Sequence, residues 1–372
     1  MLVRPVRRDE HLAFVTARGS ASFLQLPSWG LVKSEWRAES LGWFTDDGTL
    51  VGVGLVLHRQ LPAVRRSLAY LPEGPVLDWS QVVADPAAWL DPLVAYLRRA
   101  GAFGIRMGPP VVISRWSAER LKQAVAEGKA QRLGDVPPTE VEPLGSELQR
   151  VLGARGWRAP QEGAGFTAGQ PRHVFQLPLA GRTEADILKG FNQLWRRNVK
   201  KAEKEGVEVT HGTVEDLPSF HALYEETARR DGFTPRPLAY FARMWRAMSN
   251  EDPGRMTLFL ARRGGTLLAA TTLVRVGTHA WYSYGASSTV GREYRGSNAV
   301  QWQMIRESLA AGCTVYDLRG ITDTLSADDP HFGLIQFKLG TGGEAVEYVG
   351  EWDLPLNRAL YKAFDLYMRR RG

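Results

Sequence analysis

The stretch TLFLARRGGTLLAATTLV (257–274) decides the fold. Its β-forming runs, 257–261 and 267–274, flank Gly264 and Gly265, which is the pattern of a β-hairpin. Downstream we expect elements in this order: a strand at 280–284, a helix at 300–311 ending at Gly312, and a strand at 315–318. A hairpin followed by a helix and another strand predicts a mixed α/β unit.

A similar layout occurs earlier in the chain. The stretch LGWFTDDGTLVGVGLVL (41–57) predicts a hairpin around its Asp-Asp-Gly turn. A helix expected at 89–100 ends at Gly101, and a strand is expected at 103–107. Two copies of one α/β unit are the natural interpretation, with chance similarity of two α/β segments as the alternative. A length of 372 residues also favours two domains.

Composition limits the class of protein. With 44% hydrophobic and 23% charged residues, the chain is typical of soluble globular proteins. Residues 1–10 lack an apolar core and no stretch is long enough to cross a bilayer, so we expect a cytoplasmic protein. Its single cysteine, Cys313, excludes an internal disulfide and a cysteine metal cluster. The net charge of +7 favours an anionic partner.

The region between the two copies predicts loops and then one long helix. Residues 137–171 are rich in Gly and Pro, which favours loops. Thr183 and Asp186 form a capping-box pattern, apolar residues recur at helical spacing, and Gly206 supplies the stop. The basic residues of this helix are Arg196, Arg197, Lys200, Lys201 and Lys204.

Two interpretations of this basic helix stay open. Arg196, Lys200 and Lys204 are four residues apart and form a stripe of like charges, which hints at an external anion. Beside the aromatic Trp195, the stripe favours contact with RNA phosphates. The alternative is a solvated basic face relieved by neighbouring glutamates.

The stretch FKLGTGG (337–343) is the strongest candidate for chemistry, with YDLRGI (316–321) upstream of it. We expect an apolar strand with one lysine, Lys338, followed by glycines that permit close backbone approach. An ammonium group in a partly dry pocket can stabilise a developing oxyanion. The alternative is a lysine that extends from an apolar surface to water, followed by a glycine turn.

Common catalytic signatures are missing from the sequence. It contains no phosphate-binding loop, no strand-linked Gly-x-Gly-x-x-Gly, no Gly-x-Ser-x-Gly and no His-Glu-x-x-His. His331 lies near acidic residues, but a polar loop histidine explains it. Where acetyltransferases bind coenzyme A pyrophosphate, residues 292–299 read REYRGSNA, with the glycine out of step. We therefore expect no cofactor and no metal.

Several motifs in order resemble the FemABX family of aminoacyl-tRNA-dependent peptidyltransferases, close to its FemX branch, over nearly the whole chain. The motifs are QLPSWGLVK (25–33), LPEGPV (71–76), RRNVKKAE (196–203), RDGF (230–233), YGAS (284–287), YDLRG (316–320) and FKLGTGG (337–343). The resemblance implies two acetyltransferase-like (GNAT-like) domains and no coenzyme A. We expect domain 1 at 1–172 plus 345–372, for precursor binding, and domain 2 at 173–344, with the transfer site and the tRNA side.

The family's activity implies the partners. Its members transfer Gly, Ala or Ser from tRNA to an amine of the peptidoglycan precursor stem peptide, and here we expect Gly or Ala. The partners would be aminoacyl-tRNA and either UDP-MurNAc-pentapeptide or a lipid-linked precursor. We expect a monomer in the cytoplasm, associated peripherally with the inner membrane face. Two alternatives are the same chemistry on a small secondary-metabolite amine, and a non-catalytic RNA-binding protein.

The resemblance also implies site residues. Lys33 and Arg236 occupy the positions that hold the precursor diphosphate, although both could be plain surface charges. Phe337 and Lys338 match the transfer site, where the lysine stabilises the tetrahedral intermediate. Three tyrosines match the acceptor groove, with core packing as the alternative: Tyr240, Tyr282 and Tyr284.

The sequence departs from relatives in three places. Gly108, in Met107-Gly108-Pro109, stands where some relatives have Asp, and Phe103 stands where one has Tyr, so the acceptor amine could be diaminopimelate rather than lysine. Longer members carry a helical arm for tRNA, whereas here Gly206 leads directly into an expected strand. The basic helix is therefore the candidate for tRNA contact.

Overall fold

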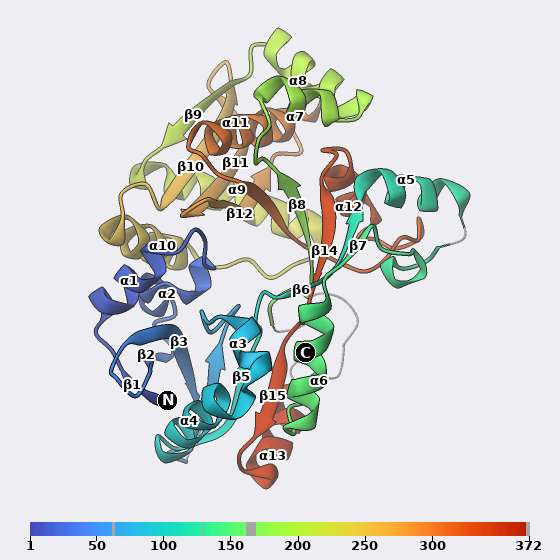
Figure 1. The fold of residues 1–372 in the computed structure, drawn as a ribbon. Helices are drawn as coiled ribbons and strands as arrows, with labels where there is room; N and C mark the ends of the chain where they lie inside the picture. The colour runs from blue at the N-terminus through green and yellow to red at the C-terminus, as the bar shows by residue number, and fades with distance from the viewer. Residues whose placement is uncertain (62–63, 129, 161–168, 370–372) are drawn as a thin grey trace. The chain divides into compact units, whose positions relative to one another are not determined.

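The computed structural model describes residues 1–61, 64–128, 130–160 and 169–369 (Figure 1). The chain divides into two compact units. Unit 1 comprises Met1–Arg115, Pro138–His173 and Val346–Gly372, and unit 2 comprises Trp116–Pro137 and Val174–Ala345. The expected boundaries put residues 116–137 in the first domain. In the structure this segment belongs to unit 2, where the Ala118 amide donates to the Gly343 carbonyl (2.9 Å).

Unit 1 is built on a sheet with the strand order β1-β2-β3-β4-β5-β15. Its strands are β1 (Leu2–Pro5), β2 (Arg37–Phe44), β3 (Leu50–Gln60), β4 (Ser67–Leu71), β5 (Ala102–Met107) and β15 (Trp352–Pro355). Its helices are α1 (Arg8–Thr16), α2 (Pro27–Val32), α3 (Trp79–Ala84), α4 (Pro86–Arg99), α6 (Pro143–Ala154) and α13 (Arg358–Arg369). Strands β6 (Val112–Ser117) and β7 (Glu140–Val141) pair antiparallel.

The predicted elements of the first copy are confirmed. Strands β2 and β3 pair antiparallel as a hairpin, and Trp43 of β2 is buried and donates its indole N–H to the Trp89 carbonyl on α4 (2.9 Å). Helix α4 begins after Asp85, whose side chain accepts the Ala88 amide, and ends before Gly101, which has a φ of +87°. Strand β5 then pairs parallel with β4.

In unit 2 the strands lie in the order β14-β8-β13-β12-β11-β10-β9. They are β8 (His173–Pro178), β9 (Glu208–Gly212), β10 (Met256–Arg263), β11 (Thr266–Val276), β12 (His279–Ser287), β13 (Val315–Ile321) and β14 (Glu344–Tyr348). The helices are α5 (Ala118–Glu127), α7 (Glu184–Gly190), α8 (Gln193–Lys204), α9 (Leu217–Asp231), α10 (Leu238–Glu251), α11 (Gly296–Ala310) and α12 (Phe332–Leu339). Helix α11 packs on β10 and β11, and α9 packs on β12.

The two units repeat one topology. Each has an antiparallel run (β1-β2-β3-β4 and β9-β10-β11-β12) whose last strand pairs parallel with the strand after a helix. That helix is α4 in unit 1 and α11 in unit 2 (Figure 1). The predicted duplication of a mixed α/β unit is therefore confirmed. Among the described residues, no helix is long and apolar enough to span a membrane.

Of the two predictions for the region between the copies, one is wrong and the other is incomplete. The single helix expected from Thr183 to Gly206 is two helices, α7 and α8, because Phe191 is extended (ψ 145°) and the Asn192 side chain caps α8 by accepting the Trp195 amide. The region 137–171, in which loops were expected, also contains helix α6 (Pro143–Ala154). Residues 161–168 of that region lie outside the described part of the chain.

Candidate active site

Lys338 lies on helix α12, not on a strand as its sequence suggested. The buried positions of α12 are Phe332, Ile335, Lys338 and Leu339, which recur at helical spacing. The apolar residues at 335, 337 and 339 also alternate, which is the pattern that predicts a strand. Helix packing decided between the two patterns.

The Lys338 ammonium group is buried against strand β13. Lys338 is 3% exposed. Its Nζ donates to the carbonyl oxygens of Gly320 (2.7 Å) and Arg319 (3.1 Å). An ammonium group has three N–H bonds. Two are used by these carbonyls, so the third can serve a substrate oxygen. These hydrogen bonds bring the FKLGTGG and YDLRGI motifs into direct contact.

Burial changes the acidity of this lysine. The pKa of Lys338 is lowered to about 7, chiefly by desolvation; the charge of Asp317 opposes this shift and that of Arg319 adds to it. An amine with such a pKa exists near neutral pH both as an ammonium, which stabilises an oxyanion, and as a free base. The alternative of a lysine extended to water is therefore wrong, because the group is enclosed.

The lysine lies where two parallel strands separate. Strand β13 pairs with β12 only from His279↔Val315 to Trp281↔Asp317, although β12 runs on to Ser287 and β13 to Ile321. On the other side of β12, the register with β11 shifts by one residue between Thr272 and Leu273, the mark of a β-bulge. The carbonyls that bind Lys338 follow the last paired residue of β13.

The glycines after Lys338 permit close packing of α12. A Cβ added at Gly340 would lie 2.1 Å from Trp195 Cδ1, and one at Gly343 would lie 2.2 Å from the Gln176 carbonyl oxygen. Trp195 is 2% exposed, and its indole N–H donates to the Phe337 carbonyl. Because the Trp195 ring is buried in this contact, it gives no support to RNA stacking beside the basic stripe.

Two of the three predicted tyrosines meet each other. The hydroxyls of Tyr240 and Tyr284 are 2.9 Å apart, and the Arg236 guanidinium carbon lies 5.5 Å from the Tyr240 ring centroid. Tyr282 packs against the same hydrophobic core as Phe337. Its hydroxyl takes the space beside Gly285, where a Cβ would lie 2.1 Å from it. Burial raises the pKa of Tyr282 to about 12.

The two cations predicted to hold a diphosphate lie in different units. Lys33 follows α2 in unit 1, with Nζ 5.4 Å from the Trp29 ring centroid. Arg236 is exposed just before α10 in unit 2. Their joint role stays a prediction.

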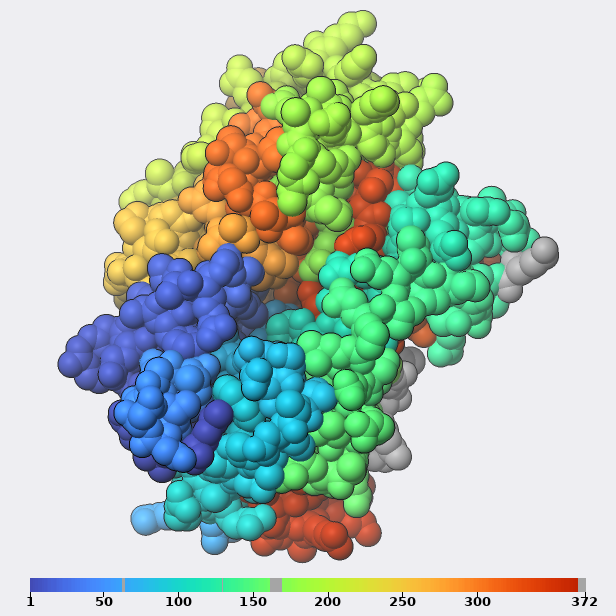
Figure 2. Space-filling view, in the orientation of Figure 1, coloured from blue at the N-terminus to red at the C-terminus, as the bar shows by residue number. Residues whose placement is uncertain are grey.

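The basic face of α8 is narrower than the sequence suggested. Arg197, Lys200 and Lys204 are exposed and share one face of α8. Figure 2 shows the yellow-green segment that contains α8 at the surface. Arg196 is half-buried and donates to the carbonyls of Lys189 (3.0 Å) and Phe191 at the end of α7. The stripe therefore begins at Arg197, because Arg196 caps the preceding helix.

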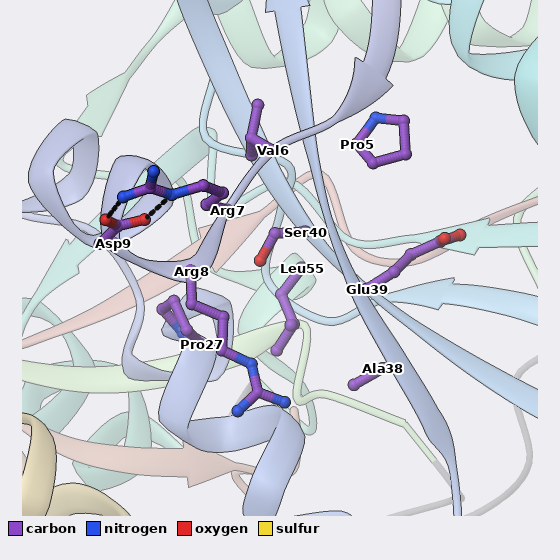
Figure 3. A pocket seen from close by; sticks show the side chains of 10 residues that line it. All are labelled: Pro5, Val6, Arg7, Arg8, Asp9, Pro27, Ala38, Glu39, Ser40 and Leu55. Atoms are coloured by element: carbon purple, nitrogen blue, oxygen red, sulfur yellow. Dashed lines mark hydrogen bonds and ion pairs between the residues drawn. The ribbon is translucent and has the colours of Figure 1, made fainter.

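A cavity of about 600 Å³ lies in unit 1, and none of the predicted site residues is among those that line it (Figure 3). Its charged lining residues include Arg7 and Asp9, whose side chains pair with each other, and Glu39, which bonds to His58 Nε2 (2.6 Å). These three charges are paired within the protein, so they do not suggest a catalytic centre.

One residue essential to this geometry had no role in the sequence analysis. Asp317 of β13 is 1% exposed and lies between the Gln176 amide and the Arg319 backbone. A signal was present, since a lone carboxylate inside an apolar strand needs buried partners.

Comparison with known proteins places this fold. The model of the FemAB family matches residues 6–253 and 258–369. The chain belongs to the FemAB family. A lipid II:glycine glycyltransferase of Staphylococcus haemolyticus is 25% identical over 430 residues, covering 97% of this chain and 94% of the relative. One of Staphylococcus aureus strain MRSA252 is 24% identical over 434 residues, with 97% and 94% covered.

Solved structures show the same fold. The crystal structure of FemX matches with a TM-score of 0.81 at 23% identity, covering 98% of this chain and 100% of that one. A tandem GNAT protein from the clavulanic acid biosynthesis pathway matches with a TM-score of 0.52 at 11% identity, covering 95% and 98%. The expected FemABX resemblance and the GNAT-like fold are confirmed.

This FemAB protein lacks segments that its curated relatives contain. The alignments extend over more positions than its 372 residues, so those relatives carry segments that it lacks. In the structure, α8 ends at Lys204 and β9 begins at Glu208, which leaves no helical arm at this point.

The other departures from relatives fall in unit 1. A Cβ at Gly108 would lie 3.1 Å from Glu351 Cγ, so the Glu351 carboxyl group stands beside this glycine. Burial raises the pKa of Glu351, whose Oε1 accepts the Tyr70 hydroxyl (2.5 Å). Phe103 is fully buried and packs on Phe364, with ring centroids 5.4 Å apart.

Proposed function

We propose that this FemAB protein transfers an amino acid, glycine or alanine, from an aminoacyl-tRNA to an amine of a peptidoglycan precursor stem peptide. The observation that carries the proposal is the buried Lys338 ammonium group, held by two carbonyls where β12 and β13 separate. The curated relatives named lipid II:glycine glycyltransferase support this reaction class and favour a lipid-linked acceptor.

The reaction needs little acid–base assistance. The neutral acceptor nitrogen attacks the ester carbonyl carbon of the aminoacyl-tRNA, and the carbonyl oxygen becomes an oxyanion. The carbon–oxygen bond to the tRNA ribose then breaks, an amide forms, and the proton lost from the nitrogen goes to the ribose oxygen. The third N–H of Lys338 would stabilise the oxyanion, and positioning would supply most of the remaining rate.

The substrates would be recognised by separate groups. Lys33 and Arg236 are the proposed ligands of the acceptor's diphosphate, since cations bind phosphate oxygens through charge-assisted hydrogen bonds. Tyr240, Tyr282 and Tyr284 would line the acceptor groove. A lipid-linked acceptor requires peripheral association with the inner membrane face.

The proposed tRNA contact is the exposed face of α8. Arg197, Lys200 and Lys204 point to solvent on a helix that is joined through Trp195 to α12, which carries Lys338. Phosphate contacts by three cations would be strongly salt-dependent.

A mass-spectrometric assay tests the function. Purified protein is incubated with glycyl- and alanyl-tRNA and, in parallel, with lipid II and UDP-MurNAc-pentapeptides that contain lysine or diaminopimelate. We expect one acceptor to gain the mass of one amino acid. Lys338→Ala should abolish this gain, whereas Lys362→Ala, an exposed lysine of α13, should not. No product with any of these acceptors would contradict the proposal and favour a small amine or a non-catalytic RNA-binding role.

A further inference from the structure

The carboxylate of Asp317 is held by three groups from three strands. Gln176 of β8 donates its amide N–H to Oδ2 (3.0 Å), His279 of β12 has Nε2 3.5 Å from the same oxygen, and the Arg319 backbone N–H donates to Oδ1 (2.5 Å). Burial by itself would raise the pKa of Asp317, but His279, Arg319 and Gln176 bring it below its usual range. Asp317 is therefore a buried, charged carboxylate.

The bond to Arg319 shapes the backbone that binds Lys338. Arg319 has a φ of +64°, a left-handed conformation that residues with a side chain rarely adopt. The Asp317 carboxylate accepts a hydrogen bond from the Arg319 backbone N–H. The carbonyl of Arg319 and that of the next residue, Gly320, both accept from Lys338 Nζ. One carboxylate thus supports the turn that presents two acceptors to one ammonium group.

Asp317 also acts on Lys338 through its charge. Of the charged groups near the lysine, Asp317 favours its protonation and Arg319 opposes it, and both lie on β13. Helix α5 also packs on α12 and carries four ionisable groups, none of which accounts for the acidity of Lys338. These are Glu119, Arg120, Lys122 and Glu127. His279 and Gln176 reach Lys338 only through Asp317.

We propose that Asp317 is a positioning residue that keeps Lys338 protonated and correctly placed for acyl transfer. Its relevance to catalysis rests on the function proposed above for Lys338. Asp317 itself is 1% exposed, so it acts through Lys338 and not on substrate. The Gln176 amide holds the carboxylate in place by a hydrogen bond, and His279 lies beside it.

Titration of Lys338 in the free protein tests the coupling without any substrate. Lysine side chains are labelled with ¹³C at Cε, and the Lys338 signal is identified by its loss in Lys338→Met. We expect a midpoint near pH 7 in the unaltered protein. Asp317→Asn should lower the proton affinity of Lys338 by about tenfold or more, moving the midpoint to lower pH.

The matched control is Asp323→Asn, which removes a half-exposed carboxylate of the same unit. It should leave the midpoint of Lys338 in place. An unchanged midpoint in a folded Asp317→Asn variant would overturn the proposal. If that variant does not fold, Gln176→Leu loosens the carboxylate while retaining its charge, and it should move the midpoint in the same direction by a smaller amount. A folded Gln176→Leu variant with an unaltered midpoint would likewise refute the coupling.

The pH dependence of kcat separates a catalytic consequence from a structural one. A reaction that needs the ammonium form loses activity as pH rises through the pKa of Lys338. In Asp317→Asn this loss should begin at lower pH. A uniform fall in kcat with the same pH profile would mean that Asp317 only stabilises the fold. Because the NMR titration uses no substrate, failure of the transfer assay would leave the coupling between Asp317 and Lys338 intact.

Discussion

The indole N–H of Trp195 donates to the carbonyl oxygen of Phe337 over 2.8 Å, and the two rings lie 4.7 Å apart. This bond joins α8, whose outer face is basic, to α12, which carries Lys338. A change on α8 can therefore move the helix that positions the ammonium group.

Trp195→Phe should weaken this connection while retaining most of the packing. We expect the loss of one buried hydrogen bond to cost about 1 kcal/mol of stability. A small displacement of α12 should lower kcat by up to about tenfold, because transfer depends on the placement of Lys338. Thermal unfolding and the mass assay measure the two effects. Trp245→Phe, on α10, is the control and should change neither; equal activity of the two variants would show that the bond has no role in positioning.

Stability should depend on Lys338 with a definite sign. Its pKa falls from an ordinary value of 10.5 to about 7 on folding, so between these values the unfolded chain binds more protons than the folded one. Stability from this group therefore rises with pH from about 7 to about 10, by an amount on the order of 3 kcal/mol. In Lys338→Met this rise should disappear. Urea unfolding at several pH values measures it, and parallel profiles for both proteins would contradict the assigned pKa.

Gly333, within α12, and Gly340, directly after its last residue, provide a matched pair of substitution sites. A Cβ added at Gly340 would collide with the buried Trp195 ring. A Cβ added at Gly333 would have nothing within 4 Å. Gly340→Ala should destabilise the protein by about 1–3 kcal/mol through overpacking. Gly333→Ala should be neutral or stabilising by up to about 1 kcal/mol, because alanine favours helix. Thermal unfolding decides; similar shifts would mean that Trp195 yields easily.

The basic face of α8 should bind RNA in a salt-dependent manner. Replacing Arg197, Lys200 and Lys204 by Gln should weaken aminoacyl-tRNA binding. It should also reduce the slope of log affinity against log salt by about two to three, since each lost phosphate contact removes slightly less than one unit.

The control for this triple variant is Arg65, Arg66 and Arg99 replaced by Gln, which removes the same charge from exposed positions of unit 1. It should leave both affinity and slope nearly unchanged. Equal losses in the two triple variants would assign RNA binding to net charge alone.

Local signals in the sequence predicted much of the fold. Glycines at 48, 101, 264, 265 and 312 mark turns and helix ends, and all five adopt positive φ. The hairpins between them are confirmed because a turn and alternating side chains specify pairing between neighbouring strands. The break between α7 and α8 was missed, although Asn192 is a favourable N-cap residue, because the apolar spacing continues across it.

The sequence by itself determined the duplicated α/β unit and its hairpins, since these depend on short-range patterns. It also indicated Lys338 as the candidate for chemistry, through the motifs of a family. Only the tertiary structure decided that Lys338 lies on a helix, that Trp195 is buried against Phe337, and that Asp317 supports the backbone around Arg319. These features depend on contacts between β8, β12, β13, α8 and α12, which are distant in the chain. Packing selects one geometry from several that the local sequence allows equally.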